Sequence, residues 1–414
     1  MIWFVLKRIP LLIVIVVSGL LMANCTMLGL NYASLETENK PAPSPILDVD
    51  LVRSDPSQIR AVFEEELYGP WPENLPVSAA LPRMINDTYL EGRGTLQEIM
   101  VTIGEGVTAR TFPVVLALPN AAIDTAVPLI ISQTFAGNCS VFPGAAVSNR
   151  DGSVCVGDEM SGMYGAIATG IFGTYIAKAP IERYFDAGMG YASFEGSGFV
   201  EDRSEAAAEI MAALSPGPKP TSALMAWGYA FHGVAGVLAE DERIKAETIT
   251  AMGHSRYGKS ALIAAAWSQH IHGAITHQSG FAGAASSRSP SGERLDRMSA
   301  SYPHWVRPGL AVDLEAGWQP TYDQHYLLAL AAPKPIFLGN GRRDVWSGPN
   351  STYRNAEAAD AAYKALGVGG LPETGGMQAF DPSAEISYWL RPGGHSVVSE
   401  DIDAFISFMT AHFG

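Results

Sequence analysis

Charged residues are scarce in this sequence, and basic residues are the scarcest of them. Asp, Glu, Lys and Arg make up 17% of the 414 residues, where about 25% is usual. The 27 basic residues face 42 acidic ones, which gives a net charge of −15. Because a protein that follows a phosphate backbone needs clustered cations, this composition argues against nucleic-acid binding. Gly and Pro follow no fixed period, which excludes collagen-like and simple repeat architectures.

The apolar content, in contrast, is high. Hydrophobic residues make up 47% of the chain, which is enough for a large core and excludes wholesale disorder. The first apolar run follows two basic residues and continues to Ala23. Since a bilayer-spanning helix needs about 20 apolar residues, this shorter run favours an export signal over a membrane span.

The end of that run, Met-Ala-Asn-Cys, is similar to a bacterial lipoprotein cleavage box in which Cys25 would be acylated. The Asn departs from the smaller residue that is usual there, so an unlipidated signal peptide stays open. We expect residues 1–25 to be a signal peptide or lipoprotein signal, with possible membrane attachment through Cys25. The protein would then be exported, as a periplasmic, outer-membrane or secreted protein.

Cysteine is rare, and only Cys139 and Cys155 lie beyond the signal. In an oxidising compartment a disulfide between them would close a loop and add about 3 kcal/mol of stability. Two free thiols are the alternative. Residues 26–46 include a polar, proline-containing stretch without apolar periodicity, which is typical of a tether.

From residue 47 onward, short apolar runs alternate with longer helical patterns and no second linker interrupts them. Strands are predicted at residues 127–132, 248–252 and 335–338, and helices at 204–214, 222–238, 256–269 and 351–366. Such alternation argues for a mostly parallel sheet that is covered by helices on both faces. We therefore predict a single α/β domain over residues 47–414.

The most informative segment joins a predicted strand to a predicted helix at Ser255. A serine on a sharp strand-to-helix turn is exposed at the sheet edge, and the helix start behind it offers N–H donors for an oxyanion. Gly253 suits the strand side of this turn. The second glycine that is usual two residues after the serine is replaced by Tyr257, so the generic pattern is only half met.

Two other interpretations of the segment stay open. Residues 253–260 also satisfy the phosphate-binding pattern G-x-x-x-x-G-K-[ST]. However, His254, Arg256 and Tyr257 would crowd a phosphate loop, and we find no later strand that ends in a suitable acidic metal ligand. The third interpretation is a structural turn with a lone serine. We favour the nucleophile.

A nucleophilic serine needs a histidine base and an acid that orients it, and in this type of fold the acid precedes the histidine in the chain. Asp344 and His395 each follow a predicted strand, in that order. His304 and His325 precede the acid, and His412 lies in a terminal helix. Each candidate alone has a structural alternative, a turn-capping acid or a loop histidine.

At this point the sequence resembles the glucuronoyl esterases, carbohydrate esterase family 15, which cleave esters between lignin alcohols and the glucuronic acid branches of xylan. The resemblance covers most of the chain from about Phe63. Its main segments are residues 226–228 (AWG), 253–259 (GHSRYGK), 292–293 (GE), 344–346 (DVW) and 394–395 (GH). The G-x-S-R-x-G-K elbow is the family's own variant, which accounts for the displaced glycine. The resemblance implies an α/β-hydrolase fold, a three-layer α-β-α sandwich.

Carried over position by position, the resemblance assigns roles to six residues. Ser255 would be the nucleophile, His395 the general base and acid, and Arg256 an oxyanion donor. The residues that would contact the uronic acid ring are Lys259, Glu293 and Trp346. Each also has a structural alternative: a solvated helix surface for the two cations, a surface salt bridge for the glutamate, and the core for the tryptophan.

Two positions depart from the family pattern. Many members place the triad acid as a Glu where this chain has Gln278, and since glutamine cannot stabilise an imidazolium by charge, the acid falls to Asp344, where other members carry theirs. At Phe281 and Ala282 the family usually has smaller residues, so we expect a narrowed pocket there.

The predicted function is a serine-dependent 4-O-methyl-glucuronoyl methylesterase that cleaves lignin–glucuronoxylan esters, as a monomer without cofactor or metal. An esterase of the same fold that acts on another acyl or uronate ester is one alternative, motivated by the pocket at Phe281. A membrane-anchored carbohydrate-binding lipoprotein with a decayed site is the non-enzymatic alternative.

Overall fold

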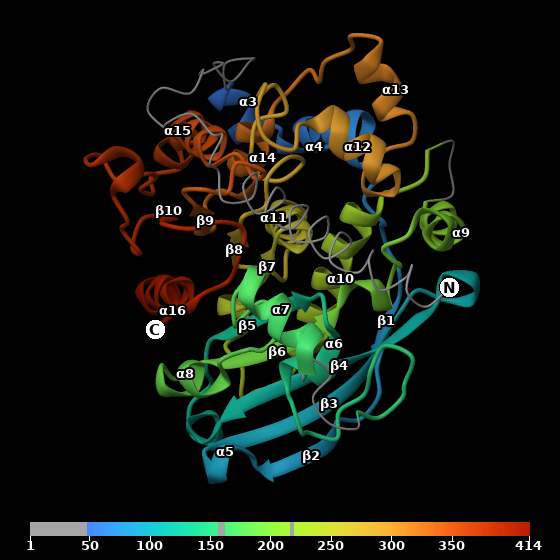
Figure 1. The fold of residues 1–414 in the computed structure, drawn as a ribbon, viewed down its shortest axis with the longest axis vertical. Helices are drawn as coiled ribbons and strands as arrows, with labels where there is room; N and C mark the ends of the chain where they lie inside the picture. Colours follow the sequence, from blue (N-terminus) through green and yellow to red (C-terminus); the bar gives the residue numbers. More distant parts are fainter. Residues whose placement is uncertain (1–47, 156–161, 216–218) are drawn as a thin grey trace, which may run out of the picture.

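The structure is a computed structural model that describes residues 48–155, 162–215 and 219–414 (Figure 1). The predicted signal segment and tether lie outside these residues. In the part of the chain that is described, no helix is both long and apolar enough to cross a membrane.

A ten-stranded sheet runs through the centre of the molecule (Figure 1). Its strands are β1 (Val77–Ala79), β2 (Arg83–Thr88), β3 (Gly94–Ile103), β4 (Arg110–Pro119), β5 (Leu129–Thr134), β6 (Gly190–Glu195), β7 (Thr250–His254), β8 (Gly273–His277), β9 (Ile336–Gly341) and β10 (Ile386–Arg391). They follow the order β1-β3-β4-β6-β5-β7-β8-β9-β10, and β2 pairs with β3 outside this path. The strands β1 to β4 pair antiparallel, whereas β5 to β10 are parallel to one another. The predicted mostly parallel sheet is confirmed.

Helices cover both faces of this sheet. The helices are α3 (Val49–Ser54), α4 (Pro56–Phe63), α5 (Tyr89–Gly92), α6 (Gly137–Val141), α7 (Gly162–Phe172), α8 (Ile181–Asp186), α9 (Ser204–Leu214), α10 (Ala223–Leu238), α11 (Arg256–Trp267), α12 (Leu295–Ser301), α13 (Leu310–Glu315), α14 (Gln324–Ala331), α15 (Pro349–Ala365) and α16 (Ser399–Phe413). Successive strand residues alternate between two cores, as the pleat requires. In β9, Ile336 and Leu338 join the core under α10, α11, α14 and α15, whereas Phe337 joins the core under α8 and α16. The result is the predicted three-layer sandwich.

The predicted strands begin one or two residues early and end two or three residues early. Apolar runs locate the start of a buried strand well, but pairing continues into polar residues such as Thr134, His254 and Asn340. These polar ends lie at the carboxyl edge of the parallel sheet, where α/β proteins bind their ligands. The strand ends that hydropathy misses are therefore the ones that carry the site.

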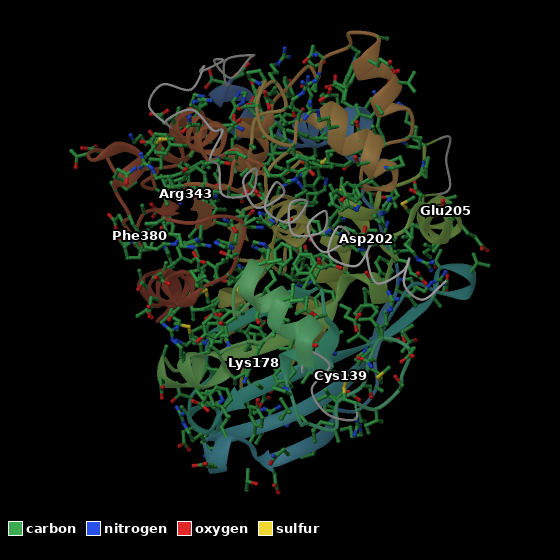
Figure 2. All side chains as sticks on the ribbon, in the orientation of Figure 1. Cys139, Lys178, Asp202, Glu205, Arg343 and Phe380 are labelled. Carbon is green, nitrogen blue, oxygen red and sulfur yellow. A yellow bond between two sulfur atoms is a disulfide. The ribbon has the colours of Figure 1, made fainter. Side chains whose placement is uncertain are left out.

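The two cysteines outside the signal segment form a disulfide, which the sequence left open. Cys139 of α6 (labelled in Figure 2) and Cys155 are joined with 5.5 Å between their Cα atoms. The same loop is held at Ser148, whose N–H and hydroxyl donate to the buried carboxylate of Glu98 at 2.5 and 3.0 Å. The disulfide thus fixes the loop that follows α6 to that helix, and the Glu98 carboxylate fixes the same loop to β3.

Candidate active site

Ser255 stands between β7 and α11 in a backbone conformation that is rare for a residue with a side chain. Its φ is +55° and its ψ is −123°, and such strain is concentrated at functional sites. The Ser255 N–H donates to the His277 carbonyl at 2.8 Å, and its own carbonyl accepts from the N–H groups of Gly258 and Lys259. The turn is therefore held from both sides, as in a nucleophile elbow.

Two glycines let α11 approach β7 closely. A Cβ on Gly253 would lie 2.0 Å from the Tyr257 carbonyl oxygen, which no side chain tolerates. A Cβ on Gly258 would lie 3.0 Å from the carbonyl oxygens of Gly253 and His277. Gly258 thus permits the close contact of helix and strands that is usually permitted by a glycine two residues after the serine.

His395 and Asp344 meet at the ends of β10 and β9, which are parallel neighbours. The Nδ1 atom of His395 lies 2.7 Å from Oδ2 of Asp344, whose side chain is 1% exposed. Ser347 donates its N–H to the other carboxylate oxygen at 3.2 Å. Burial alone would raise the pKa of Asp344, but the charge and hydrogen bond of His395, together with Ser347, hold it below the ordinary value. An ionised Asp344 keeps the proton on Nδ1, so Nε2 is left as the base.

Ser255 and His395 line one cavity of about 870 Å³, which is at the upper end of the range for small-molecule sites. Four other predicted site residues line it as well: Arg256, Lys259, Glu293 and Trp346. The rest of the wall is mainly apolar and includes Phe135, Ala168, Phe172, Ile176, Tyr302 and Trp305. The structure therefore brings all of the predicted site residues to one place, with Asp344 buried behind His395.

Arg256, the first residue of α11, is held in an aromatic and acidic environment. Its guanidinium pairs with Asp202 (labelled in Figure 2) and lies 4.8 Å from the ring centroid of Trp305. Asp202 also accepts from His304 Nε2 at 2.9 Å and from Trp305 Nε1 at 2.7 Å. Although burial opposes it, the hydrogen bond from His304 and the charge of Arg256 lower the pKa of Asp202 to about 2. Arg256 is thus a fixed cation at the cavity, and the alternative of a solvated helix surface is wrong for it.

Asp202 is a site residue that was not predicted from the sequence, although its position carries a signal. Asp202 follows the end of β6 by seven residues, so it emerges from the same sheet edge as Asp344 and His395. The rule that found those two residues applies to it equally.

Lys259 is buried, with a side chain that is 3% exposed. Its ammonium donates to the carbonyl oxygens of Ser279 at 2.7 Å and Phe281 at 2.6 Å and lies 3.5 Å from Glu293 Oε2. Burial lowers the pKa of Lys259. Because its protons face these carbonyls, the cation holds the loop after β8, which also weighs against the phosphate-binding interpretation.

The geometry corrects one structural expectation and excludes two structural alternatives. Phe281 does not narrow the pocket, because its side chain is fully buried in the hydrophobic core and does not line the cavity. Trp346 is not a core residue, since it is 44% exposed and lines the cavity. Glu293 makes a buried ion pair with Lys259 rather than a surface one.

A pair of buried histidines lies beside His395. His254 and His277 end the strands β7 and β8, and their Nδ1 atoms are 2.9 Å apart. His277 Nε2 lies 3.2 Å from the buried carboxylate of Asp401, and the ring centroids of His254 and His395 are 4.4 Å apart. Burial, reinforced by the charge of His395, lowers the pKa of His254 well below its ordinary value. The neutral imidazole of His254 therefore lines the cavity beside His395.

Metal-ligand geometry is not found at this site. Across residues 48–155, 162–215 and 219–414, no group of three or more His, Cys, Asp or Glu side chains is placed to hold a metal ion. The expectation of a metal-free enzyme stays a prediction.

Comparison with known proteins identifies the family. The model "Glucuronyl esterase, fungi" matches residues 147–367, just over half of the chain, including the elbow and Asp344. The chain belongs to this glucuronyl esterase family. It is accordingly a serine esterase, a carboxylic ester hydrolase with the α/β-hydrolase fold that the resemblance implied.

Individual relatives of this glucuronyl esterase agree with that identification. It is 25% identical over 404 residues to the carbohydrate esterase MZ0003 from an unknown prokaryotic organism, with 93% of this chain and 92% of that protein covered. It is 28% identical over 173 residues to 4-O-methyl-glucuronoyl methylesterase 1 of Phanerochaete chrysosporium, with 37% and 35% covered. A promiscuous esterase of carbohydrate esterase family 15 from a marine bacterial metagenome shares the fold, with a TM-score of 0.75, 23% identity, and coverage of 92% of this chain and 99% of that one.

Proposed function

We propose that this esterase hydrolyses 4-O-methyl-glucuronoyl esters, including those that link lignin alcohols to glucuronoxylan, through Ser255, His395 and Asp344. One observation carries the proposal: His395 bonds to a buried, ionised Asp344 at the wall of the cavity that the strained Ser255 also lines. The name of the Phanerochaete chrysosporium relative supports the substrate class.

The chemistry follows from the protonation states. His395 Nε2 takes the proton of the Ser255 hydroxyl while the serine oxygen attacks the ester carbonyl carbon. The tetrahedral intermediate collapses as His395 returns the proton to the departing alcohol, which leaves a glucuronoyl ester on Ser255. Water then attacks this ester, His395 accepts a water proton, and collapse of the second intermediate frees the acid and restores the serine.

The negative charge of each intermediate develops beside the start of α11. Arg256 is the first residue of this helix, so its N–H group precedes the helical hydrogen-bond ladder. Its guanidinium lines the same cavity, held by Asp202. Donors fixed before the reaction stabilise an oxyanion without a reorganisation cost, and loss of one typically lowers kcat by about 10²–10³-fold.

The two ends of the substrate would meet different walls. Glu293 and the exposed face of Trp346 are placed to receive hydroxyl groups and the C–H surface of a sugar. Ala168 and Phe172 of α7, with Ile176, form an apolar wall of the same cavity that suits a hydrophobic alcohol. The substrate itself is neutral until hydrolysis, so the net charge of −15 does not repel it.

We also propose that the enzyme is exported and attached to a membrane through Cys25. The disulfide between Cys139 and Cys155 supports export, because disulfides persist mainly in oxidising compartments. Radiolabelled palmitate incorporated into the full-length protein, and absent from a Cys25→Ser variant, would establish the anchor. Incorporation in neither protein would refute it.

Hydrolysis of benzyl glucuronate, compared with hydrolysis of 4-nitrophenyl acetate, tests the substrate assignment. We expect turnover of the glucuronate with a clear preference over the acetate, and loss of both activities in Ser255→Ala. A preference for the acetate would favour an esterase for other acyl groups. The structural reason for that alternative, a pocket narrowed at Phe281, does not hold because this side chain is buried in the core. No turnover of either ester would favour a carbohydrate-binding protein.

A further inference from the structure

The side chain of Gln278 forms hydrogen bonds with the backbone on both sides of His395. Its amide nitrogen donates to the carbonyl oxygen of Gly394 at 2.8 Å, and its amide oxygen accepts from the N–H of Ser396 at 3.0 Å. The side chain thus spans the residue that carries the base, and no hydrogen bond joins it to the imidazole among the described contacts.

Gln278 is itself fixed in place. It directly follows β8, is 1% exposed, and has a φ of +49°. Its N–H donates to the Gly339 carbonyl at 2.8 Å, and its carbonyl accepts from the Ser347 hydroxyl at 3.1 Å. A rigid strand end therefore presents the amide to the His395 loop.

A primary amide matches this pair of backbone groups at every pH. The carbonyl of Gly394 needs a donor and the N–H of Ser396 needs an acceptor, and a primary amide offers both. An ionised glutamate offers acceptors alone, so one carboxylate oxygen would face the Gly394 oxygen without a proton between them. We propose that Gln278 is a positioning residue that holds the His395 loop in register with Ser255, and that its amide, rather than a carboxylate, is what this role requires here. The inference rests on the proposed role of His395.

Several charged groups surround position 278, and they bear on a charge placed there. Arg391 lies 3.5 Å from the Gly394 oxygen, and Lys259 bonds to the carbonyl of the adjacent Ser279. His395 and Asp344 lie beyond the gripped backbone, and His277, paired with Asp401, precedes Gln278 on β8. The cations favour an ionised side chain, whereas burial and the Asp344 carboxylate disfavour it.

Two substitutions of the same length separate positioning from general packing. Gln278→Met removes both hydrogen bonds at every pH. Gln278→Glu loses the donor only while it is ionised, because a protonated carboxyl group donates through its O–H and accepts through its C=O, as the amide does. We expect both variants to lower kcat by about 10²-fold at pH 8 with little change in KM, since a misplaced catalytic group commonly has an effect of this size.

The pH dependence is the readout that a merely structural role would not produce. As pH falls, the carboxylate introduced by Gln278→Glu becomes protonated, and its O–H can again donate to Gly394. The ratio of kcat for Gln278→Glu to kcat for Gln278→Met should therefore rise towards low pH, while the titration of His395 is present in both variants. A ratio that stays flat or falls would contradict the proposed match of donor and acceptor.

Gln133 offers a matched control. It is also buried, donates to the Trp227 carbonyl at 2.7 Å and accepts from the Ser260 hydroxyl at 2.7 Å, but does not touch the His395 loop. Gln133→Glu should lower the free energy of unfolding without the loss of kcat. Equal kcat losses in the control and the position 278 variants, or wild-type kcat in both of the latter, would overturn the inference.

The rate of Ser255 labelling by a fluorophosphonate keeps this test separate from the substrate assignment. Labelling needs the serine and its base but no glucuronate. If wild-type protein fails to hydrolyse benzyl glucuronate, the proposed substrate is wrong. Slower labelling of both position 278 variants than of Gln133→Glu would still support the positioning role, and equal labelling rates would refute it.

Discussion

Replacing Asp344 by asparagine should abolish most of the activity, and the structure shows why an isosteric change is so damaging. The N–H of Ser347 donates to one carboxylate oxygen, and His395 Nδ1 meets the other. An asparagine that keeps its oxygen towards Ser347 turns its NH₂ group towards Nδ1. The imidazole must then accept at Nδ1 and carry its proton on Nε2, where it can no longer take the proton of Ser255.

The magnitude can be worked from the same contact. At the 2.7 Å between His395 Nδ1 and Asp344 Oδ2, with an effective dielectric constant of about 20, Coulomb's law gives about 6 kcal/mol between carboxylate and imidazolium. Since about 1.4 kcal/mol corresponds to a tenfold change in rate, loss of this charge alone accounts for about 10⁴ in kcat. The wrong tautomer acts in the same direction, so we expect a loss of about 10⁴-fold.

Steady-state hydrolysis of benzyl glucuronate at pH 8 measures this loss, with circular dichroism as the check on folding. Asp323→Asn is the matched control, because Asp323 is also a buried carboxylate, with Ser286 and Ser287 as donors, and does not line the cavity. We expect the control to lose stability but to keep its turnover. A kcat for Asp344→Asn within about tenfold of wild type would refute the assignment of the acid.

Three further predictions follow from other contacts. Asp202→Asn should lower kcat by up to about 10²-fold with little change in KM, because it frees the guanidinium of Arg256; in an Arg256→Ala background it should have no further effect on the same assay. Reduction of the bond between Cys139 and Cys155 should lower the free energy of unfolding by about 3 kcal/mol in urea titrations, and a double serine variant should show no change on reduction. Although burial opposes it, His277 and Arg391 favour the charged form of Asp401 and lower its pKa to about 2. The contribution of this carboxylate to the free energy of unfolding is therefore present at neutral pH and is lost as pH falls from about 4 to about 2. Asp401→Asn should remove this part of the acid sensitivity of unfolding.

The sequence sufficed to locate Ser255, Asp344 and His395 because two physical rules act together on them. Parallel strands present their carboxyl ends at one sheet edge, and this fold orders its nucleophile, acid and base along the chain. Each residue follows an apolar run that hydropathy detects. The structure places the serine in a strained turn and the other two residues in contact, and their catalytic roles stay predictions.

Contacts that depend on loop paths could not be predicted in the same way. The strand-end rule indicates that Asp202 leaves the sheet at the edge that carries the site. It does not indicate that Asp202 pairs with Arg256, 54 positions away, because no periodicity encodes the path of the loop. The error at Phe281 has a local cause. Gln278 and Ala282 both take positive φ angles, +49° and +52°, which reverse the loop and turn the ring between them into the core. Residue type alone gives no warning of such a reversal.

Residues that follow two different strands, β8 and β9, hold the catalytic base His395 in place. Because β8, β9 and β10 are consecutive parallel neighbours, their carboxyl ends lie at the same edge of the sheet. Gln278, Asp344 and His395 each follow one of these ends. Adjacent strands are about 4.8 Å apart, so a side chain from β9 reaches the imidazole, while one from β8 reaches the backbone that carries it. Asp344, which follows β9, already accepts the hydrogen bond of His395 Nδ1. A second carboxylate at position 278 would therefore add no necessary acceptor, and it would lose the hydrogen bond to the Gly394 oxygen. The amide at position 278 is therefore the expected partner of an acid at position 344.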